Sequence, residues 1–188
     1  RPLASRRAPP ADLLPDRRGY LRAMRGLEAA VAETGISSPV VRVPHHLAHA
    51  VSASLALPGA TGAVLTADGM GDDLCATVRI GERGRLGEPI ATVDDSHSLG
   101  SIYAKITFVL GMVPNEHEYK LMGMAPYAPA SGAQKSYERF KDLFLWGGNG
   151  KLTWKRAPGV PHTYYSYKFF RDLVERQRFD WISAGLQQ

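Results

Sequence analysis

Three of the six histidines in the chain lie within the stretch PHHLAHA, from Pro44 to Ala50. Leucine and alanine favour a helix there, and His45 and His49 are four residues apart, so that they share one helical face. Two imidazoles on one face are suitable ligands for zinc, iron or manganese. His46 points about 100° away from that face and is predicted to support the ligands or to face a substrate. The alternative is that all three histidines are solvated side chains of a surface helix.

Asp68 is the carboxylate that the sequence places nearest to these histidines. A short apolar strand is predicted over 39–43, and a second strand ends at Asp68, with the histidine helix between them. If the two strands are parallel, the segment is a βαβ crossover, and the helix start and the strand end meet at the carboxyl edge of the sheet. We therefore predict a metal site formed by His45, His49 and Asp68. Taken alone, Asp68-Gly69 is equally a turn dipeptide that ends a strand.

A glycine-rich segment, LTADGMGDD, covers residues 65–73. Gly69 and Gly71 permit positive φ values and allow backbone N–H groups to approach a phosphate. The segment is not a Walker-type loop, because no Gly-Lys-Ser/Thr follows it. A hairpin turn explains the same glycines, so both interpretations stay open.

A third group of polar residues lies in PNEHEYKLMGMAPYA, residues 114–128. Here Glu118, Tyr119 and Lys120 are followed by Gly123. An acid, a phenol, an ammonium group and a glycine this close together are typical of a substrate-binding loop. The alternative is a solvated connection whose methionines close the core.

The remaining patterns predict one domain of the α/β class with a mixed sheet. Residues 1–16 are expected to be a flexible lead-in, and residues 17–188 to form the domain. Hydrophobic periodicity predicts helices over 17–35, 44–57 and 99–110, and a further helix from residue 169 onwards. A loop or broken helix is predicted over 113–133. Strands are predicted over 39–43, 62–68 and 151–156, and a pair of strands within 74–95.

Composition narrows the class of protein further. The 188 residues are 44% hydrophobic, enough to bury a core, and the one cysteine, Cys75, excludes an internal disulfide and fits a reducing cytoplasm. No apolar run is long enough to span a bilayer and no secretory signal is visible, so we expect a cytoplasmic protein without a membrane partner. The net charge of +5 is concentrated at the two ends, without a basic and aromatic stripe, which does not favour a nucleic-acid partner.

Four motifs, in this order, resemble the NodU/CmcH-type O-carbamoyltransferase family: HHLAHAVSA, AVLTADGMGD, SHSLGSIYAKITFVLG and PNEHEYKLMGMAPYA. The resemblance is close over residues 40–128 and looser elsewhere. It implies an N-terminal domain with the actin-like ATPase (ASKHA) fold, similar to the transferase that makes threonylcarbamoyl-adenosine in tRNA. It also implies a C-terminal adenylate-forming domain that is absent here, so that residues 17–188 would be a fragment of the first domain, incomplete at both ends.

The resemblance implies a two-stage reaction. Carbamoyl phosphate and ATP would give carbamoyl-AMP in the second domain, and the first domain would pass the carbamoyl group to a hydroxyl of a sugar or another natural product. A divalent metal, iron with zinc or manganese as alternatives, would be held by His45, His49 and Asp68, with a further aspartate ligand beyond residue 188.

The resemblance also assigns roles to other residues. Lys120 is the catalytic candidate, because it would neutralise charge that develops during transfer. The general base is left open between His46 and His97. The residues that match phosphate- and substrate-contacting positions of the family are Gly69, Gly71, Glu118, Tyr119 and Gly123. The sequence departs from the usual family pattern at His117 and Ala128.

Two other classes of protein remain open from the sequence. One is a relative of the tRNA-modifying transferase, against which the Glu-Tyr-Lys-x-Met-Gly loop argues. The other is a non-catalytic actin-like or metal-binding module. For the favoured carbamoyltransferase we expect the fragment to depend on the rest of its own chain and to be inactive alone, because half of the nucleotide cleft would be missing. Its last helix is expected to need a partner surface for Phe179, Trp181, Ile182 and Leu186.

Overall fold

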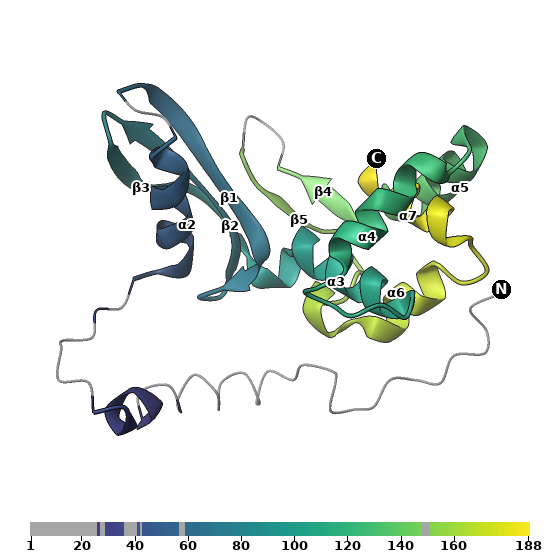
Figure 1. Cartoon of the computed structure of the whole chain (residues 1–188). Helices are drawn as coiled ribbons and strands as arrows, with labels where there is room; N and C mark the ends of the chain where they lie inside the picture. Colours follow the sequence, from purple (N-terminus) through teal and green to yellow (C-terminus); the bar gives the residue numbers. More distant parts are fainter. Residues whose placement is uncertain (1–25, 27–28, 36–40, 42, 57–58, 148–150) are drawn as a thin grey trace. The chain divides into compact units, whose positions relative to one another are not determined.

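A computed structural model describes residues 26, 29–35, 41, 43–56, 59–147 and 151–188 (Figure 1). The described residues divide into two units, those up to Val43 on the one hand and those from Pro44 to Gln188 on the other. In the first unit, residues 29–33 are helical and Gly35 has a φ of 69°, as expected of the residue that stops the predicted helix. The lead-in over 1–16 and the apolar residues Leu21, Met24 and Leu27 of that helix lie outside the described residues.

The first half of the second unit is a three-stranded antiparallel sheet. Its strands, in spatial order, are β1 (Thr61–Gly71), β2 (Leu74–Glu82) and β3 (Arg85–Asp94). Asp72-Asp73 and Arg83-Gly84 join them, and all four turn residues have positive φ values, between 48° and 76°. Two-residue turns of this kind match the right-handed twist of the strands they connect. The predicted strand pair around a glycine turn is confirmed.

The predicted βαβ crossover is wrong for the described residues. β1 pairs antiparallel with β2, and Val41 and Val43 lie outside any strand, while the other residues of the predicted strand over 39–43 are not described. The crossover requires a strand over 39–43 beside β1, and the described residues of that segment belong to no strand. The neighbour of β1 is β2, and the two-residue turn that joins them connects only antiparallel strands. The described sheets are therefore antiparallel rather than mixed.

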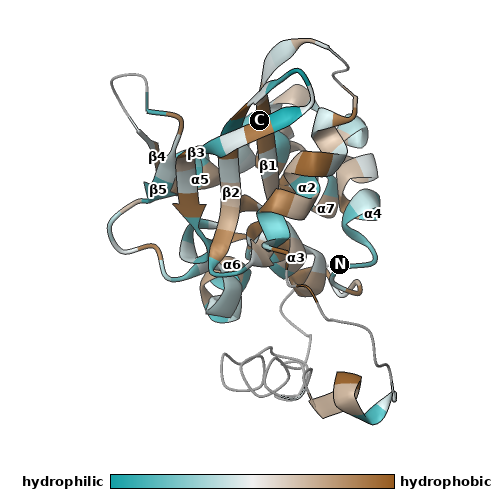
Figure 2. Ribbon diagram, turned by 90° about the vertical axis from the view of Figure 1, so that its left-hand side faces the viewer, coloured by the Kyte–Doolittle hydropathy of each residue, from teal (hydrophilic) through white to brown (hydrophobic). Residues whose placement is uncertain are grey.

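Helix α2 (His45–Ser54) packs on β1 and β2 through its two buried residues, His46 and Ala50. Pro44 stands at its N-cap in an extended conformation, with φ −55° and ψ 136°. The helix is shorter than predicted, because residues 55 and 56 already form a turn. Figure 2 shows its mixed polar and apolar surface beside the sheet. The histidines are therefore presented from the start of a short helix that is anchored to the sheet.

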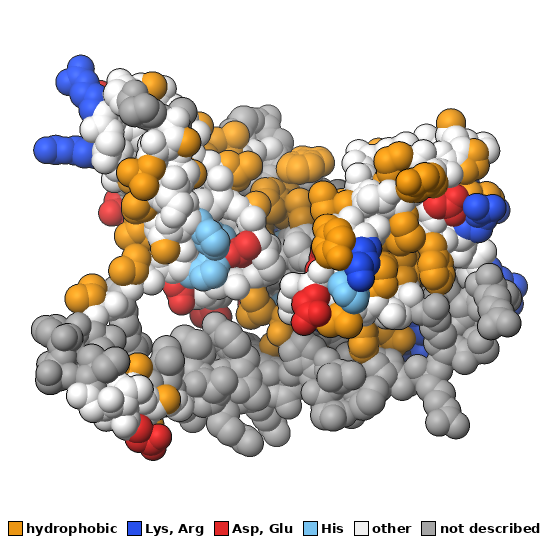
Figure 3. All heavy atoms as spheres, in the orientation of Figure 1, with side chains coloured by type: hydrophobic (Ala, Val, Ile, Leu, Met, Phe, Trp, Pro, Cys, Tyr) orange, Lys and Arg blue, Asp and Glu red, His pale blue; other side chains and the backbone are white. Residues whose placement is uncertain are grey.

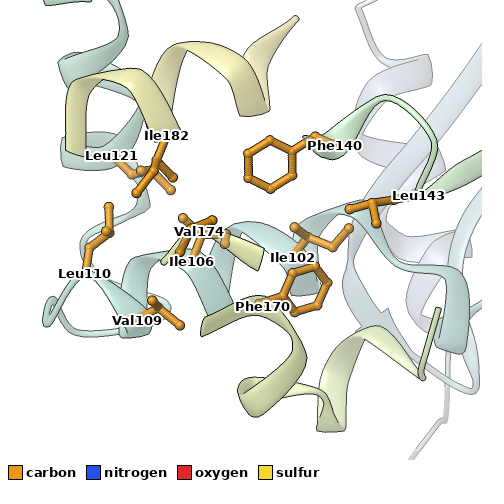
Figure 4. Close-up of a cluster of buried hydrophobic side chains, with 10 residues drawn as sticks. All are labelled: Ile102, Ile106, Val109, Leu110, Leu121, Phe140, Leu143, Phe170, Val174 and Ile182. Atoms are coloured by element: carbon orange, nitrogen blue, oxygen red, sulfur yellow. The ribbon is translucent and has the colours of Figure 1, made fainter. Parts of the chain in front are cut away.

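The second half of the unit is a set of helices around one apolar core (Figure 4). The helices are α3 (Leu99–Val109), α4 (Glu118–Met124), α5 (Ala130–Phe140), α6 (Tyr167–Leu173) and α7 (Phe179–Gln187). Short 3-10 turns accompany them: η3 (Asp95–His97), η4 (Ala125–Tyr127) and η5 (Thr163–Tyr165). A hairpin is formed by β4 (Phe144–Trp146) and β5 (Trp154–Arg156). Ile106, Leu121, Phe170 and Ile182 are among the largest fully buried side chains and come from four different helices. The predicted helix over 99–110 and the broken helix over 113–133 are confirmed, and the strand predicted over 151–156 is confirmed for residues 154–156.

The helix predicted from residue 169 onwards is instead two helices, α6 and α7. The chain reverses after Val174, and Arg176 takes a φ of 62°. Val174 and Gln177 in this connection are buried, so the break brings the apolar faces of both helices onto the same core. A single straight helix would leave one of those faces in water.

The apolar residues of α7 find a partner surface within the described chain. Ile182 is buried in the core, and the helix crosses α5 closely at two glycines. A Cβ at Gly132 would lie 2.5 Å from the indole ring of Trp181, and one at Gly185 would lie 2.5 Å from Ser136 Cβ. Phe179 and Leu186 also pack against the core. The expectation that these four residues need a partner surface outside the described chain is therefore wrong.

A second, smaller apolar cluster lies on the sheet. Cys75, Ala76 and Val93 are buried there, and Trp154 from the β4–β5 hairpin packs against them. Burial, reinforced by nearby carboxylates, raises the pKa of the Cys75 thiol to about 12. This cysteine is therefore a buried, protonated core residue. The helices within the described residues are all too short or too polar to cross a membrane.

Lys105 is a buried ammonium group in α3 and gives the fold a defined pH dependence. Lys105 is only 6% exposed, and its Nζ lies 4.5 Å from the centre of the Tyr164 ring. Burial lowers the pKa of the Lys105 ammonium group from 10.5 to about 8. Between those two values the unfolded chain holds a proton that the folded chain has lost. The free energy of unfolding therefore rises with pH in this range.

We expect Lys105→Met to remove this pH dependence. Relative to the variant, the free energy of unfolding of the wild-type protein should rise by about 3 kcal/mol from pH 7 to pH 10.5. Urea denaturation at a series of pH values measures the difference. Parallel pH profiles for the two proteins would contradict it.

Candidate metal centre

The candidate site forms where the start of α2 meets the carboxyl end of β1. The backbone N–H of His45 donates to the Asp72 carboxylate at 2.6 Å, which satisfies a free donor of the first helical turn and places a negative charge at the helix N-terminus. The β1–β2 register is regular from Thr61 to Ala67 and resumes, shifted, at Gly71. Asp68 lies in this irregular stretch, and its side chain contacts the helix.

His45, His49 and Asp68 converge on one point. The two histidine Nε2 atoms are 3.0 Å apart, His49 Nε2 lies 3.3 Å from Asp68 Oδ2, and His45 Nε2 contacts the same oxygen. One ligand atom from each residue lies within 4.8 Å of the others. Figure 3 shows the histidine side chains at the surface over α2, beside an acidic side chain. The sequence predicts that these three side chains meet, but it predicts this for a parallel crossover, whereas the observed sheet is antiparallel.

The three side chains fit a divalent transition metal. Imidazole nitrogen and carboxylate oxygen are ligands of iron, zinc and manganese. Asp68 Oδ1 is buried without a hydrogen-bond partner, so the carboxylate has acceptor capacity that the described residues leave unused. The side chains of His45, His49 and Asp68 are 41%, 53% and 23% exposed, which leaves room for water or substrate as further ligands. A second group of this kind does not occur elsewhere in the described ranges.

His46 faces the sheet and not the solvent. Its residue is 3% exposed; Nδ1 lies 2.9 Å from Thr66 Oγ1, and Nε2 lies 3.2 Å from the Leu74 carbonyl oxygen. Of the two alternatives left by the sequence, a substrate-facing histidine is therefore wrong.

Gly71 shapes the site through its missing side chain. A Cβ at this position would lie 2.2 Å from Cγ and Cδ2 of His45 and 2.8 Å from its Cβ. A Cβ at Gly69 would meet no heavy atom within 4 Å. Gly71 therefore packs against a candidate ligand, and the predicted phosphate contacts of both glycines stay predictions.

The N-terminus of α3 holds the end of β1 through residues that sequence analysis did not single out. Ser98 Oγ donates to the Asp68 carbonyl at 3.1 Å, and Ser101 Oγ donates to the Gly69 carbonyl at 3.2 Å. A Cβ at Gly100 would lie 2.8 Å from the Asp68 carbonyl oxygen. The serine before the helix signals an N-cap in the sequence. Nothing in the sequence indicates which strand it would hold.

The Glu-Tyr-Lys residues lie on α4. Glu118 Oε1 accepts a hydrogen bond from the backbone N–H of Asn115 at 2.7 Å, Tyr119 is 65% exposed, and Lys120 Nζ lies 5.7 Å from the centre of the Tyr119 ring. A Cβ at Gly123 would face open space. Figure 3 shows charged side chains over α4 on the same face as the histidines over α2. Within the described part of the chain, no hydrogen bond or ion pair joins Lys120 to the candidate metal ligands, so its catalytic role stays a prediction.

The second general-base candidate, His97 in η3, is a structural acceptor. Its Nδ1 accepts from Arg156 Nε at 3.1 Å, and its carbonyl accepts from the Trp154 indole at 2.9 Å. Burial, and then the charge of Arg156, lower the pKa of His97. These contacts join β5 to η3 and leave Nδ1 no capacity to take a substrate proton.

Comparison with known proteins identifies the family. Residues 19–158, which include all the candidate site residues, match the family model described as the carbamoyltransferase N-terminus. The chain belongs to this carbamoyltransferase family, and the resemblance to the NodU/CmcH type is confirmed.

Three relatives share sequence with the chain. They are an uncharacterised protein of Synechocystis (36% identical over 129 residues), the nodulation protein NolNO of Sinorhizobium fredii (36% over 126) and the nodulation protein NolO of Bradyrhizobium diazoefficiens (32% over 104). The alignments cover 66%, 66% and 55% of this chain but only 20%, 18% and 19% of the relatives. The chain thus spans about a fifth of the length of the curated relatives it matches.

Proposed function

We propose that this chain is the metal-binding part of an O-carbamoyltransferase. The observation that supports the proposal most strongly is the convergence of His45, His49 and Asp68 in a chain of the carbamoyltransferase family. These residue types meet at the irregular end of a strand and remain partly open to solvent, as a catalytic metal site requires.

His45, His49 and Asp68 would hold a divalent ion, with iron the first choice and zinc or manganese as alternatives. When bound, such an ion supplies a Lewis acid that polarises a carbonyl or phosphoryl oxygen. The chain's own part is to hold the three donors in place. Asp72 fixes the start of α2, Gly71 makes room for the His45 ring, and Ser98 fixes the backbone of Asp68.

The proposed reaction uses carbamoyl phosphate and ATP. An adenylate-forming domain elsewhere in the full-length protein would first hydrolyse carbamoyl phosphate with water to carbamate and phosphate. The carbamate oxygen would then bond to the α-phosphorus of ATP and displace pyrophosphate, which gives carbamoyl-AMP. The hydroxyl oxygen of the acceptor then bonds to the carbamoyl carbon, the bond from that carbon to the phosphate oxygen breaks, and AMP leaves while a base takes the hydroxyl proton. We assign the described domain to an actin-like fold, and the single buried cysteine and the use of ATP fit a cytoplasmic location.

Residues on α4 and in the glycine turn complete the proposed site. Lys120 would neutralise the charge that develops on the leaving phosphate. Lys120 is exposed on α4, which supports access to a substrate from solvent. The proposed contacts to phosphate or substrate are those of Gly69, Gly71, Glu118, Tyr119 and Gly123.

The reaction class is tested with the full-length protein, carbamoyl phosphate, ATP and a panel of sugar-bearing alcohols. We expect pyrophosphate, AMP and a carbamoylated alcohol as products. The matched variant Asp68→Asn should still form carbamoyl-AMP but should not transfer it, because only the described domain is altered.

Three results would contradict the proposal. Absence of both carbamoyl-AMP and AMP would exclude the reaction class. Transfer of labelled carbamoyl groups to tRNA would favour the tRNA-modifying relative, and a full-length protein that binds neither metal nor nucleotide would be a non-catalytic module.

A further inference from the structure

We propose that His46 is a positioning residue that orients the Asp68 carboxylate toward the metal, an inference that rests on the proposed metal centre. His46 does not itself reach the point where the three candidate ligands converge. It lies between the sheet and the Asp68 carboxylate, and it acts on the carboxylate and not on the metal.

The hydrogen-bond partners of His46 determine which ring nitrogen carries the proton. The Leu74 carbonyl oxygen can only accept, so Nε2, 3.2 Å away, must donate to it. Nδ1 is then the acceptor and receives the Thr66 hydroxyl proton at 2.9 Å. Thr66 Oγ1 in turn lies 2.8 Å from Thr77 Oγ1, which supplies the next proton. Each of these buried groups then has a partner, and the tautomer of His46 is fixed.

The fixed His46 ring lies beside the free side of Asp68. Nε2 lies 3.6 Å from Asp68 Oδ1, the oxygen that is buried and has no hydrogen-bond partner. The other oxygen, Oδ2, is the one that contacts His45 and His49. One carboxylate oxygen therefore faces the candidate ligands. The other lies beside the His46 ring, at a distance too long for a hydrogen bond, while the Nε2–H group donates to Leu74. The ring therefore limits how far the carboxylate can turn, and groups packed behind a metal ligand in this way fix its orientation.

The His46 ring also fixes the two halves of the site relative to each other. It belongs to α2, which carries both histidine ligands, and its partners Thr66 and Leu74 belong to β1 and β2. The Thr66–Thr77 pair lies directly opposite across the sheet, so the ring is anchored to two strands at once. Rotation of α2 about its axis would break these contacts and would move His45 and His49 away from Asp68.

The test measures cobalt(II) binding to the full-length protein by calorimetry and by the absorption bands of the bound ion. We expect His46→Ala to weaken binding by about 10- to 100-fold and to shift those bands. His46→Gln should recover affinity to within about fivefold of wild type, because its amide N–H group can take the place of Nε2–H. The matched control is Val64→Ala, which opens space on the same buried face of β1 without touching the hydrogen bonds. It should leave both affinity and spectrum unchanged.

If His46→Ala fails to fold, Thr66→Val replaces it, since it removes the partner of Nδ1 while keeping the shape of the side chain. We expect a smaller loss of affinity in the same direction. The inference is overturned if His46→Ala binds cobalt as wild type does, or if Val64→Ala loses as much affinity as His46→Ala. A wild-type protein that binds no cobalt, iron or zinc would instead overturn the metal centre itself, so the two failures are distinguishable.

Discussion

Replacing His49 by alanine is expected to lower the metal affinity of the full-length protein by more than about 100-fold, and His45→Ala should do the same. Each change removes one of three donors whose atoms lie within 4.8 Å of one another. Protein prepared without chelator should contain about one iron or zinc ion per chain, and both variants should lose it. Elemental analysis of the purified proteins gives the metal content directly.

His117→Ala is the matched control for this experiment. His117 stands at the N-cap of α4, where its Nδ1 accepts from the backbone N–H of Val113 at 3.1 Å, and it is not part of the cluster. Its replacement should leave the metal content unchanged. An unaltered metal content in both His45→Ala and His49→Ala would exclude the proposed ligand set.

Gly71→Ala is expected to weaken metal binding by about tenfold or more, although the residue offers no ligand atom. The new Cβ would lie 2.2 Å from His45 Cγ and 2.8 Å from His45 Cβ, which are the side-chain atoms nearest to the backbone. Rotation about the side-chain bonds does not relieve a contact so near the backbone. The His45 ring or the start of α2 must therefore move, and Nε2 leaves its place beside Asp68. Calorimetric titration with cobalt(II) measures the loss.

Gly69→Ala serves as the control, because a Cβ at that position meets no heavy atom within 4 Å. The variant differs from Gly71→Ala by two positions in the same strand and adds the same methyl group. Its metal affinity should stay within about twofold of wild type. Equal losses in the two variants would show that any added side chain in this turn disturbs the site, and would contradict the specific packing of Gly71 on His45.

Local patterns in the sequence determined most of the secondary structure and the candidate ligands. The i, i+4 spacing places His45 and His49 on one helical face, and the apolar run before Asp68 marks a strand, although the strand continues to Gly71 and does not end at Asp68 as predicted. The helix over 99–110 and the two strands around Gly84 were also predicted, because their signals lie within a few neighbouring residues. These features depend on periodicity and turn chemistry, which a short stretch of chain carries by itself.

Only the tertiary structure decided how the strands pair and what surrounds the ligands. The pattern of strand, helix and strand predicted a parallel crossover, but Val41 and Val43 lie outside any strand, and the described neighbour of β1 is the antiparallel strand β2. The break after Val174 follows from the common core that α6 and α7 share, which no local pattern shows.

The supporting contacts of the site lie beyond the reach of any local pattern. Ser98 holds Asp68 from thirty residues away in the chain, and His46 meets Thr66 and Leu74 across twenty and twenty-eight residues. Gly71 is required because the His45 ring occupies the space that its side chain would fill. Residue type and spacing thus specify which groups can bind a metal, whereas long-range packing decides whether those groups are held in one place.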